Sequence, residues 1–355
     1  MYEINIEYID KDGARRVEFD LEETSLDLSK KGILEISLDV LKDAPEIKEL
    51  VLGPNKIAKI DLSPLSSLKR LEVISLFKNQ ITTIDLTPLS NCDSLRELNL
   101  GTNQIESLDL APLSRCVDLQ RLRLFNNKLP EIDLAPLSDC KKLASLELET
   151  NNLSSIDLSP LSKCSELSQL NLMYNSINEV DLSPLSSCGN LKFIYLHQNA
   201  IGSIDLTPLS NAADIRILRL GGNELATIDL EPLAACTSLR RLELAMNALT
   251  ELDLGPLANC TELRALDIAG NQLERIDLNP LSECSALEEL YLHSNHPQEN
   301  EFNELDLSPL FACNELEDLG VSEDIEMYAD ASLKTQKKKP PALEELVEEG
   351  LLSWR

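Results

Sequence analysis

The sequence predicts an α/β solenoid in which a short strand and a short helical turn alternate from one repeat to the next. Two observations lead to this prediction. Asn recurs every 24 residues from Asn55 to Asn295, and the apolar residues around each Asn keep the same positions. A unit of this length cannot bury its apolar residues alone, so neighbouring units must stack and share one continuous core.

Each unit reads L-x-x-L-x-L-x-x-N-x-L-x-x-I-D-L-x-P-L-x-x-C-x-x, most clearly in residues 119–142 and 143–166. This pattern resembles the 24-residue typical class of leucine-rich repeats, and it is also similar to the repeats of internalins and phosphatase regulators. The resemblance covers residues 23–321 and implies a right-handed, horseshoe-shaped solenoid with a parallel sheet on its concave side. It also implies that the repeated Asn hydrogen bonds backbone groups of adjacent turns.

The elements of one unit follow from its residues. The L-x-x-L-x-L segment predicts a strand whose alternate side chains point into the core. The D-L-x-P-L segment predicts a short convex helix or 3-10 turn, because Ser or Thr before Pro provides an N-cap followed by the first helical position. We expect this N-cap in six units, at Ser63, Thr87, Ser159, Ser183, Thr207 and Ser308.

Both ends of the array depart from the repeat. Alternating apolar residues on either side of the turn at residues 11–13 predict a β-hairpin in residues 1–22, which would cover the open core and sheet edge of the first repeat. Residues 23–321 then form about twelve repeats, the first degenerate, plus a partial one. In residues 322–355 a linker precedes a helix from Ala342 to Leu352, which either caps the last repeat or recognises another protein.

Composition narrows the class of protein. A hydrophobic fraction of 43% excludes intrinsic disorder, and no apolar run reaches the roughly 18 residues that a membrane span needs. The lack of such a run leads us to expect no membrane partner. The net charge of −29 repels a phosphate backbone, so we also expect no nucleic-acid partner. The acidity itself favours either solubility alone or attraction of a basic protein. The first residues lack the pattern of a secretion signal, so we expect a cytoplasmic protein.

Nine Cys residues occupy one position of the unit, which Leu68 and Ala212 fill in two other repeats. A position shared with Leu and Ala is buried and apolar, so we interpret these thiols as small, reduced hydrophobic side chains. Neither end of the chain contains Cys, which again favours a cytoplasmic protein.

Eleven Asp residues recur in the same way, beginning with Asp61. Their carboxylates either accept backbone N–H groups at the turn or share bridging cations, and one Asp per unit favours the backbone role because Ca²⁺ needs more oxygen ligands. His293 and His296 lie beside acids on either side of Asn295, yet we expect no metal site there. The chain contains no motif for catalysis or for a cofactor.

Positions three, five, seven and eight of the unit point outward on the concave side. They hold six of the eight aromatic residues between residues 47 and 321, together with seven acids and five bases. Aromatic and Arg side chains are typical of protein interfaces, although aromatic residues also favour strands in general. The densest group, which we predict to bind a protein partner, comprises Arg121, Arg123, Phe125, Met173, Tyr174, Phe193, Tyr195, His197 and Arg219.

A second candidate surface is the irregular unit between Asn271 and Cys313. Asn295 and Asp306 are eleven residues apart where the other units use six, which predicts five extra residues within residues 296–302. Such an insertion either contributes to binding or is simply tolerated at the surface.

These features predict a monomeric, non-enzymatic interaction scaffold that needs no cofactor and binds a folded protein on its concave face. Two alternatives stay open. The chain could serve as the substrate receptor or regulatory subunit of an enzyme supplied in trans, or it could be a structural protein that associates with itself through its ends.

Overall fold

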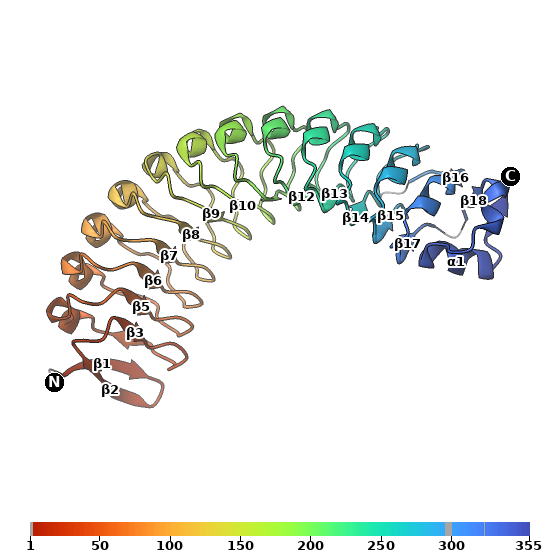
Figure 1. The fold of residues 1–355 in the computed structure, drawn as a ribbon. Helices are drawn as coiled ribbons and strands as arrows, with labels where there is room; N and C mark the ends of the chain where they lie inside the picture. Colours follow the sequence, from red (N-terminus) through yellow and green to blue (C-terminus); the bar gives the residue numbers. More distant parts are fainter. Residues whose placement is uncertain (1–2, 295–299, 323) are drawn as a thin grey trace. The chain divides into compact units, whose positions relative to one another are not determined.

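Short strands and 3-10 turns alternate along the computed structural model, which describes residues 3–294, 300–322 and 324–355. The chain forms two compact units, Met1–Ser176 and Ile177–Arg355, and each is built from the same repeating pair of elements (Figure 1). The division falls inside the predicted array. The division of the chain into the segments 1–22, 23–321 and 322–355 therefore stays a prediction.

In the first unit, one strand from each repeat joins a parallel sheet in chain order. Paired residues stand 24 positions apart, as in Leu98 beside Leu122, so the sheet register equals the repeat length. The strands are β3 (Ser25–Asp27), β5 (Glu49–Val51), β6 (Val73–Ser75), β7 (Glu97–Asn99), β8 (Arg121–Arg123), β9 (Ser145–Glu147) and β10 (Gln169–Asn171).

The second unit repeats this arrangement. Its strands also run parallel in chain order, and the last pair is offset by five more residues because Leu290 lies beside Leu319. The strands are β11 (Phe193–Tyr195), β12 (Ile217–Arg219), β13 (Arg241–Glu243), β14 (Ala265–Asp267), β15 (Glu289–Tyr291) and β17 (Asp318–Gly320).

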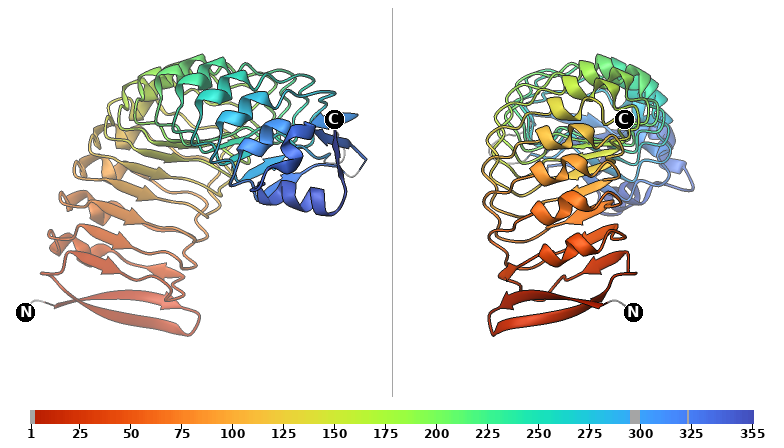
Figure 2. Two further views of the ribbon diagram at one scale, coloured as in Figure 1. Left: turned by 45° about the vertical axis from the view of Figure 1, so that its right-hand side comes forward. Right: turned by 90° about the vertical axis from the view of Figure 1, so that its left-hand side faces the viewer.

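A 3-10 turn, rather than an α-helix, returns the chain in each repeat, because 24 residues leave no room for a longer element. Within each unit these turns line the side opposite to the strands (Figure 2). They are η1 (Asp39–Asp43), η2 (Ser63–Ser67), η3 (Thr87–Asn91), η4 (Ala111–Arg115), η5 (Ala135–Leu137), η6 (Ser159–Lys163), η7 (Ser183–Ser187), η8 (Thr207–Asn211), η9 (Glu231–Ala235), η10 (Gly255–Asn259), η11 (Asn279–Glu283) and η12 (Ser308–Ala312).

From η2 to η12, the ladder of Asp residues, and not Ser or Thr, caps these turns. Ser63 is the first residue of η2, and the Asp61 Oδ1 atom accepts its backbone N–H at 2.8 Å. The Ser63 hydroxyl and this N–H both lower the pKa of Asp61. The backbone role predicted for the Asp ladder is thus confirmed. The N-cap prediction was wrong for Ser63, Thr87, Ser159, Ser183, Thr207 and Ser308, because each of them opens its turn and donates its N–H to the preceding Asp.

The repeated Asn joins adjacent turns as the resemblance implied. The Asn127 Nδ2 atom donates to the carbonyls of Leu100 and Leu124, both at 3.0 Å, while Oδ1 accepts the Ile105 N–H at 3.0 Å. Asn127 is only 8% exposed. Its side chain therefore satisfies backbone groups that the stacking of repeats would otherwise leave buried without partners.

All nine Cys residues are buried as free thiols, as predicted from their position. In the first unit, the thiol of Cys116 donates to the Cys92 carbonyl at 3.7 Å and that of Cys140 to the Cys116 carbonyl at 3.5 Å. Burial raises the pKa of Cys92 to about 11 and that of Cys116 to about 12. These thiols are therefore unreactive packing groups.

The N-terminal hairpin comprises β1 (Glu3–Asp10) and β2 (Gly13–Asp20), which pair along their whole length as predicted. Ile6 and Phe19 are buried and so close the core at this end of the first unit. However, β1 pairs with β4 (Glu35–Ile36) and not with β3. The hairpin therefore covers the core of the first repeat without pairing with the edge of the parallel sheet.

The C-terminal residues form another small sheet, which is parallel and consists of β16 (Glu304–Asp306), β18 (Glu326–Ala329) and β19 (Leu352–Trp354). Between its last two strands lie η13 (Ala331–Thr335) and α1 (Pro341–Glu348), so the helix ends before the predicted Leu352. The Ala342 N–H donates to the Leu316 carbonyl at 3.0 Å and Leu343 is fully buried. The helix is therefore docked at the end of the second unit, and does not stand free as a recognition helix.

Candidate functional site

The outward face of the strands is defined here by positions three, five, seven and eight of the repeat. The predicted register is confirmed, since Leu122 and Leu124 are buried while Arg121, Arg123 and Phe125 are exposed or half-buried. Five of the nine predicted partner-binding residues lie in the first unit and four in the second.

Arg121 and Arg123 belong to a ladder of ion pairs in the first unit. The Arg121 guanidinium lies 2.7 Å from Glu97, and Arg123 bridges Glu97 on β7 and Glu147 on β9, the latter at 3.0 Å. Exposed pairs of this kind add little stability, about 0.2 to 1 kcal/mol each. Their main effect is to hold both guanidinium groups in fixed positions on the outward face.

Phe125 packs across a glycine onto an aromatic residue two repeats away. Its ring centroid lies 5.8 Å from that of Phe77, at an angle of 45°. Gly101 separates them along the sheet, and a Cβ atom there would lie 2.5 Å from the Phe125 ring. A Cβ atom at this position would therefore force the Phe125 ring to move. Phe77 and Phe125 together form a half-buried apolar platform, of which only Phe125 was predicted as a site residue.

Met173 and Tyr174 lie two repeats further along the same unit. Met173 is half-buried, whereas Tyr174 is 53% exposed. Tyr174 also has a φ of 52°, a left-handed conformation that is unfavourable for a residue with a large side chain. Strain of this kind persists where the surrounding structure imposes it, and it presents the phenol ring to solvent.

The four predicted residues of the second unit come together in one cluster. The rings of Phe193 and Tyr195 are nearly parallel at 6.5 Å, and the His197 ring meets Tyr195 edge-on at 6.4 Å. The Arg219 guanidinium lies 5.8 Å from the centre of the Tyr195 ring, within the range of a cation–π interaction. Phe193 and Tyr195 stay half-buried and therefore accessible.

His197 differs from its neighbours because it is only 8% exposed. Burial, followed by the charge of Arg219, lowers the pKa of His197 to about 4. The imidazole is therefore neutral near pH 7 and supports Tyr195 from within the cluster, and it offers little accessible surface to a partner.

Three outward-facing acids lie deeper than their charge suggests. Burial is the main cause that raises the pKa of Glu149 to about 7, and it also raises the pKa values of Glu243 and Asp267. The repeat pattern predicted all three only as acids at outward-facing positions. Their burial depends on the side chains of adjacent repeats, which a position in the repeat does not reveal.

The irregular unit differs from its prediction. Asn300, and not Asn295, carries the ladder bonds: its Nδ2 donates to the carbonyls of Ile268 at 3.0 Å and Leu292 at 2.9 Å, and its Oδ1 accepts the Leu273 N–H. The five extra residues thus precede the ladder Asn. Asn295, His296 and the segment to residue 299 lie outside the described residues. Phe302 is 6% exposed and fills the apolar position that follows the ladder Asn, so it is a core residue.

His293 packs edge-on against Tyr291, with ring centroids 6.0 Å apart. Within residues 3–294, 300–322 and 324–355, no three His, Cys, Asp or Glu side chains are grouped so as to hold a metal ion. The helices of these same residues include none with the length and apolar character of a membrane span.

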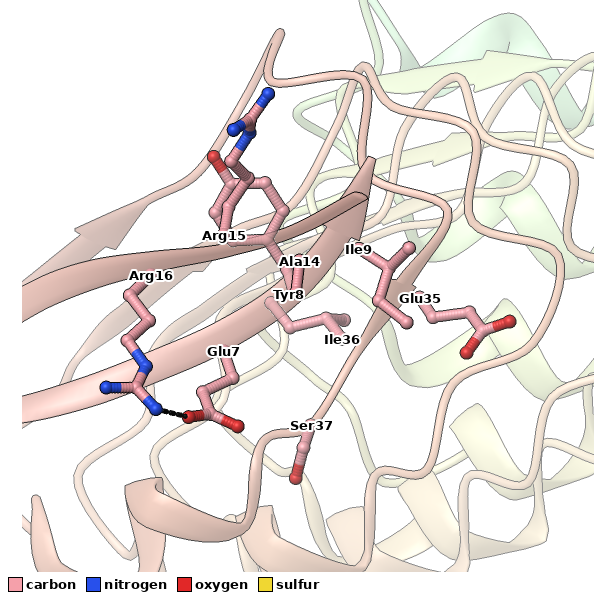
Figure 3. A pocket seen from close by; sticks show the side chains of 9 residues that line it. All are labelled: Glu7, Tyr8, Ile9, Ala14, Arg15, Arg16, Glu35, Ile36 and Ser37. Carbon is pink, nitrogen blue, oxygen red and sulfur yellow. Dashed lines mark ion pairs between the residues drawn. The ribbon is translucent and has the colours of Figure 1, made fainter. Parts of the chain in front are cut away.

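Several hollows among the described residues lie away from the outward face. One is formed by β1, β2 and β4, where Glu7 and Arg16 are ion-paired at 2.8 Å (Figure 3). Ile9 points into this hollow and is 42% exposed. The side chains that line the hollow do not form a catalytic group. Others run beside the Asp ladder, for example around Asp109, Asp133 and Asp157. These hollows contain no arrangement of acid, base and nucleophile.

Profiles of repeat families match the chain. The family described as "Leucine Rich repeats (2 copies)" matches residues 69–113, the "BspA type Leucine rich repeat region (6 copies)" matches residues 102–211, and "Leucine rich repeat" matches residues 237–296. No curated protein sequence matches the chain.

Solved structures share the fold over most of the chain. The internalin InlF of Listeria monocytogenes is 26% identical with a TM-score of 0.70, covering 88% of this chain and 89% of its own. InlJ of the same organism, whose functional domain includes a cysteine ladder, is 22% identical with a TM-score of 0.66, covering 86% of this chain and 67% of its own. The Arabidopsis thaliana receptor-kinase ectodomain GASSHO1/SCHENGEN3 is 27% identical with a TM-score of 0.63, covering 83% of this chain and 37% of its own.

Proposed function

Since the chain is a leucine-rich-repeat protein, we propose that it is a non-enzymatic scaffold that binds a folded protein partner on the outward face of its strands. Proteins with this fold commonly mediate protein–protein interactions, and stacked repeats provide an extended binding surface.

The observation that carries this proposal is the set of aromatic and Arg side chains held in place on that face. In the second unit, Phe193 and Tyr195 stack and Arg219 lies against Tyr195. In the first unit, Phe125 rests on Gly101 and Tyr174 is exposed in a strained backbone conformation. Tyr and Arg are frequent hot-spot residues, and side chains that are already ordered lose little entropy on binding.

The neighbours favour the same interpretation. The GASSHO1/SCHENGEN3 ectodomain, which is 27% identical to this chain, was solved in complex with CASPARIAN STRIP INTEGRITY FACTOR 2. A protein with this fold therefore binds a separate molecule. We further propose that the protein acts in a reducing, cytoplasmic compartment, because its nine cysteines are free thiols.

Affinity purification from native extract tests this proposal. The bait is the wild type beside a Phe125→Ala, Tyr174→Ala, Tyr195→Ala variant whose fold is checked by circular dichroism. Val117→Ala is the matched control, because Val117 is an apolar residue that is 49% exposed away from the outward positions. We expect a protein that the wild type and the control recover and the triple variant loses. Equal recovery by all three would contradict binding at this face.

A further inference from the structure

One acid on the outward face, Glu149, lacks a partner of the kind that two other outward-facing acids have. The Glu243 Oε2 atom lies 3.2 Å from the Arg219 Nε atom, and the Asp267 Oδ1 atom accepts the Ala269 N–H at 3.1 Å. In contrast, the Oε2 atom of Glu149 is buried and receives no hydrogen bond from the described residues. A buried carboxylate oxygen without a donor is unfavourable, so its presence calls for an explanation.

The charged side chains around Glu149 do not supply the missing donor. On the β8 side Arg123 is already engaged by Glu97 and Glu147, and Glu147 on β9 adds a second negative charge. On the other side β10 contributes only the uncharged residues 169–171. The charged neighbours of Glu149 are thus Arg123, which already forms two ion pairs, and Glu147, which has the same charge as Glu149.

Apolar side chains flank Glu149 at the same position of the two adjacent repeats. The Asn126 N–H donates to the Glu149 carbonyl at 2.8 Å, and the Thr150 N–H donates to the Met173 carbonyl at 2.9 Å. These bonds place Glu149 between Phe125 and Met173. The Phe125 ring packs over Gly101, on the side away from Glu149. Glu149 therefore has apolar neighbours on both sides, and the Phe125 ring does not cover it.

Electrostatics agree with this geometry. Burial is the main cause that raises the pKa of Glu149 to about 7, and Glu147 acts in the same direction, while the Glu149 backbone N–H and Arg123 oppose them. Much of the desolvation that normally opposes formation of an interfacial ion pair is thus already present in the free protein.

We infer that Glu149 receives a positively charged side chain, Lys or Arg, from the bound protein partner. The methylene groups of that side chain would pack against Phe125 and Met173, and its charged end would donate to the carboxylate. Glu149 as a whole is half-buried, so part of its side chain is open to an incoming cation. This inference rests on the proposed function and specifies the chemistry of the residue that the partner inserts.

The test uses the full chain with ¹³C-labelled Glu carboxyl groups, observed by NMR. Glu149→Gln identifies the Glu149 signal by its loss, and Glu131→Gln identifies an exposed acid of the same unit as a control. The protein is titrated with pH in the presence of Nα-acetyl-arginine amide, or of the citrulline analogue, which has a similar shape but no charge.

We expect the arginine derivative to move the midpoint of the Glu149 titration about one pH unit lower, since a cation within hydrogen-bonding distance favours the ionised carboxylate. The citrulline analogue and the Glu131 signal should show no such change. An equal effect of both compounds, or an equal effect on Glu131, would overturn the inference, because neither shows selective recognition of charge at Glu149.

The protein recovered by affinity purification supplies a second arm. We expect Glu149→Gln to weaken its binding about tenfold or more, with Glu131→Gln unchanged. If the triple variant loses the partner while Glu149→Gln retains full affinity, the inference fails and the proposed function stands. If the triple variant retains the partner, the proposed function fails instead.

Discussion

The inward and outward sides of each strand follow opposite rules. Inward positions hold nearly identical residues in every repeat, such as Leu122 and Leu146, which pair on adjacent strands and are fully buried. Outward position seven holds Phe125, Glu149 and Met173 in three successive repeats. The uniform residues specify register and core, whereas departures from uniformity give each part of the surface its own chemistry. Changes at the two kinds of position should therefore have different effects.

The largest expected effect lies in the uniform Asn ladder. Asn127→Ala removes the side chain that satisfies the Ile105 N–H and the Leu100 and Leu124 carbonyls. We expect the free energy of unfolding to fall by about 3 to 5 kcal/mol, because several buried polar groups lose their partners together. Urea denaturation measures the change. Asn152→Ala is the control, since Asn152 is exposed, and equal loss in both variants would show that the ladder carries no special stability.

A second prediction concerns the glycine beneath Phe125. Gly101→Ala places a methyl group 2.5 Å from the ring, so the ring must move and the variant should lose about 1 to 2 kcal/mol of stability. Adding Phe125→Ala removes the clash. The double variant should therefore be more stable than the two single effects predict when added, as a double-mutant cycle measures. Strict additivity would contradict the packing of Phe125 over Gly101.

The third prediction is a pH dependence at Glu149. Its pKa is about 7 in the folded chain against 4.5 for an ordinary Glu, so the protonated form favours folding. The stability it contributes is present below about pH 4.5 and is lost as pH rises through 7. Glu149→Gln should therefore be more stable than wild type by about 1 to 2 kcal/mol at pH 8, and by much less at pH 5. A difference that does not vary with pH would show that Glu149 titrates normally.

The smallest effect is expected at position eight, which adopts a left-handed conformation in many repeats. Thr150 has a φ of 56°, whereas Gly222 occupies the equivalent position with a φ of 63°. Thr150→Gly relieves the steric cost of a branched side chain but increases the entropy of the unfolded chain, so we expect a net gain of about 0.5 kcal/mol. Thermal unfolding should show a slightly higher Tm, and a lower Tm would contradict the argument.

Repetition made most of the fold predictable, and it also caused one error. The 24-residue count pointed to Asn295 as the ladder residue, yet Asn300 makes the ladder bonds. The spacing to Asp306 would have revealed this, because Asn300 precedes it by the six residues that other units use. The N-terminal hairpin and the C-terminal segment lie outside the repeat pattern. Periodicity therefore could not predict that β1 pairs with β4 or that β18 pairs with β16, and not with the main parallel sheets.

The sequence predicted which residues of the candidate site face outward, but not how deeply each side chain is buried. Alternation along a strand fixes which side chains point outward, and Arg121, Phe125 and Tyr195 lie there as predicted. The burial of His197 and of the Glu149 carboxylate depends on contacts with neighbouring repeats. The sequence of one unit does not contain that information.

Hydrogen–deuterium exchange of the chain with and without its purified partner tests the central claim most directly. We predict that the partner slows exchange in peptides covering residues 121–125, 171–175 and 193–197, and leaves the 3-10 turns η4 and η7 unchanged. Slowed exchange confined to those turns, to the N-terminal hairpin or to α1 would contradict binding on the outward face of the strands.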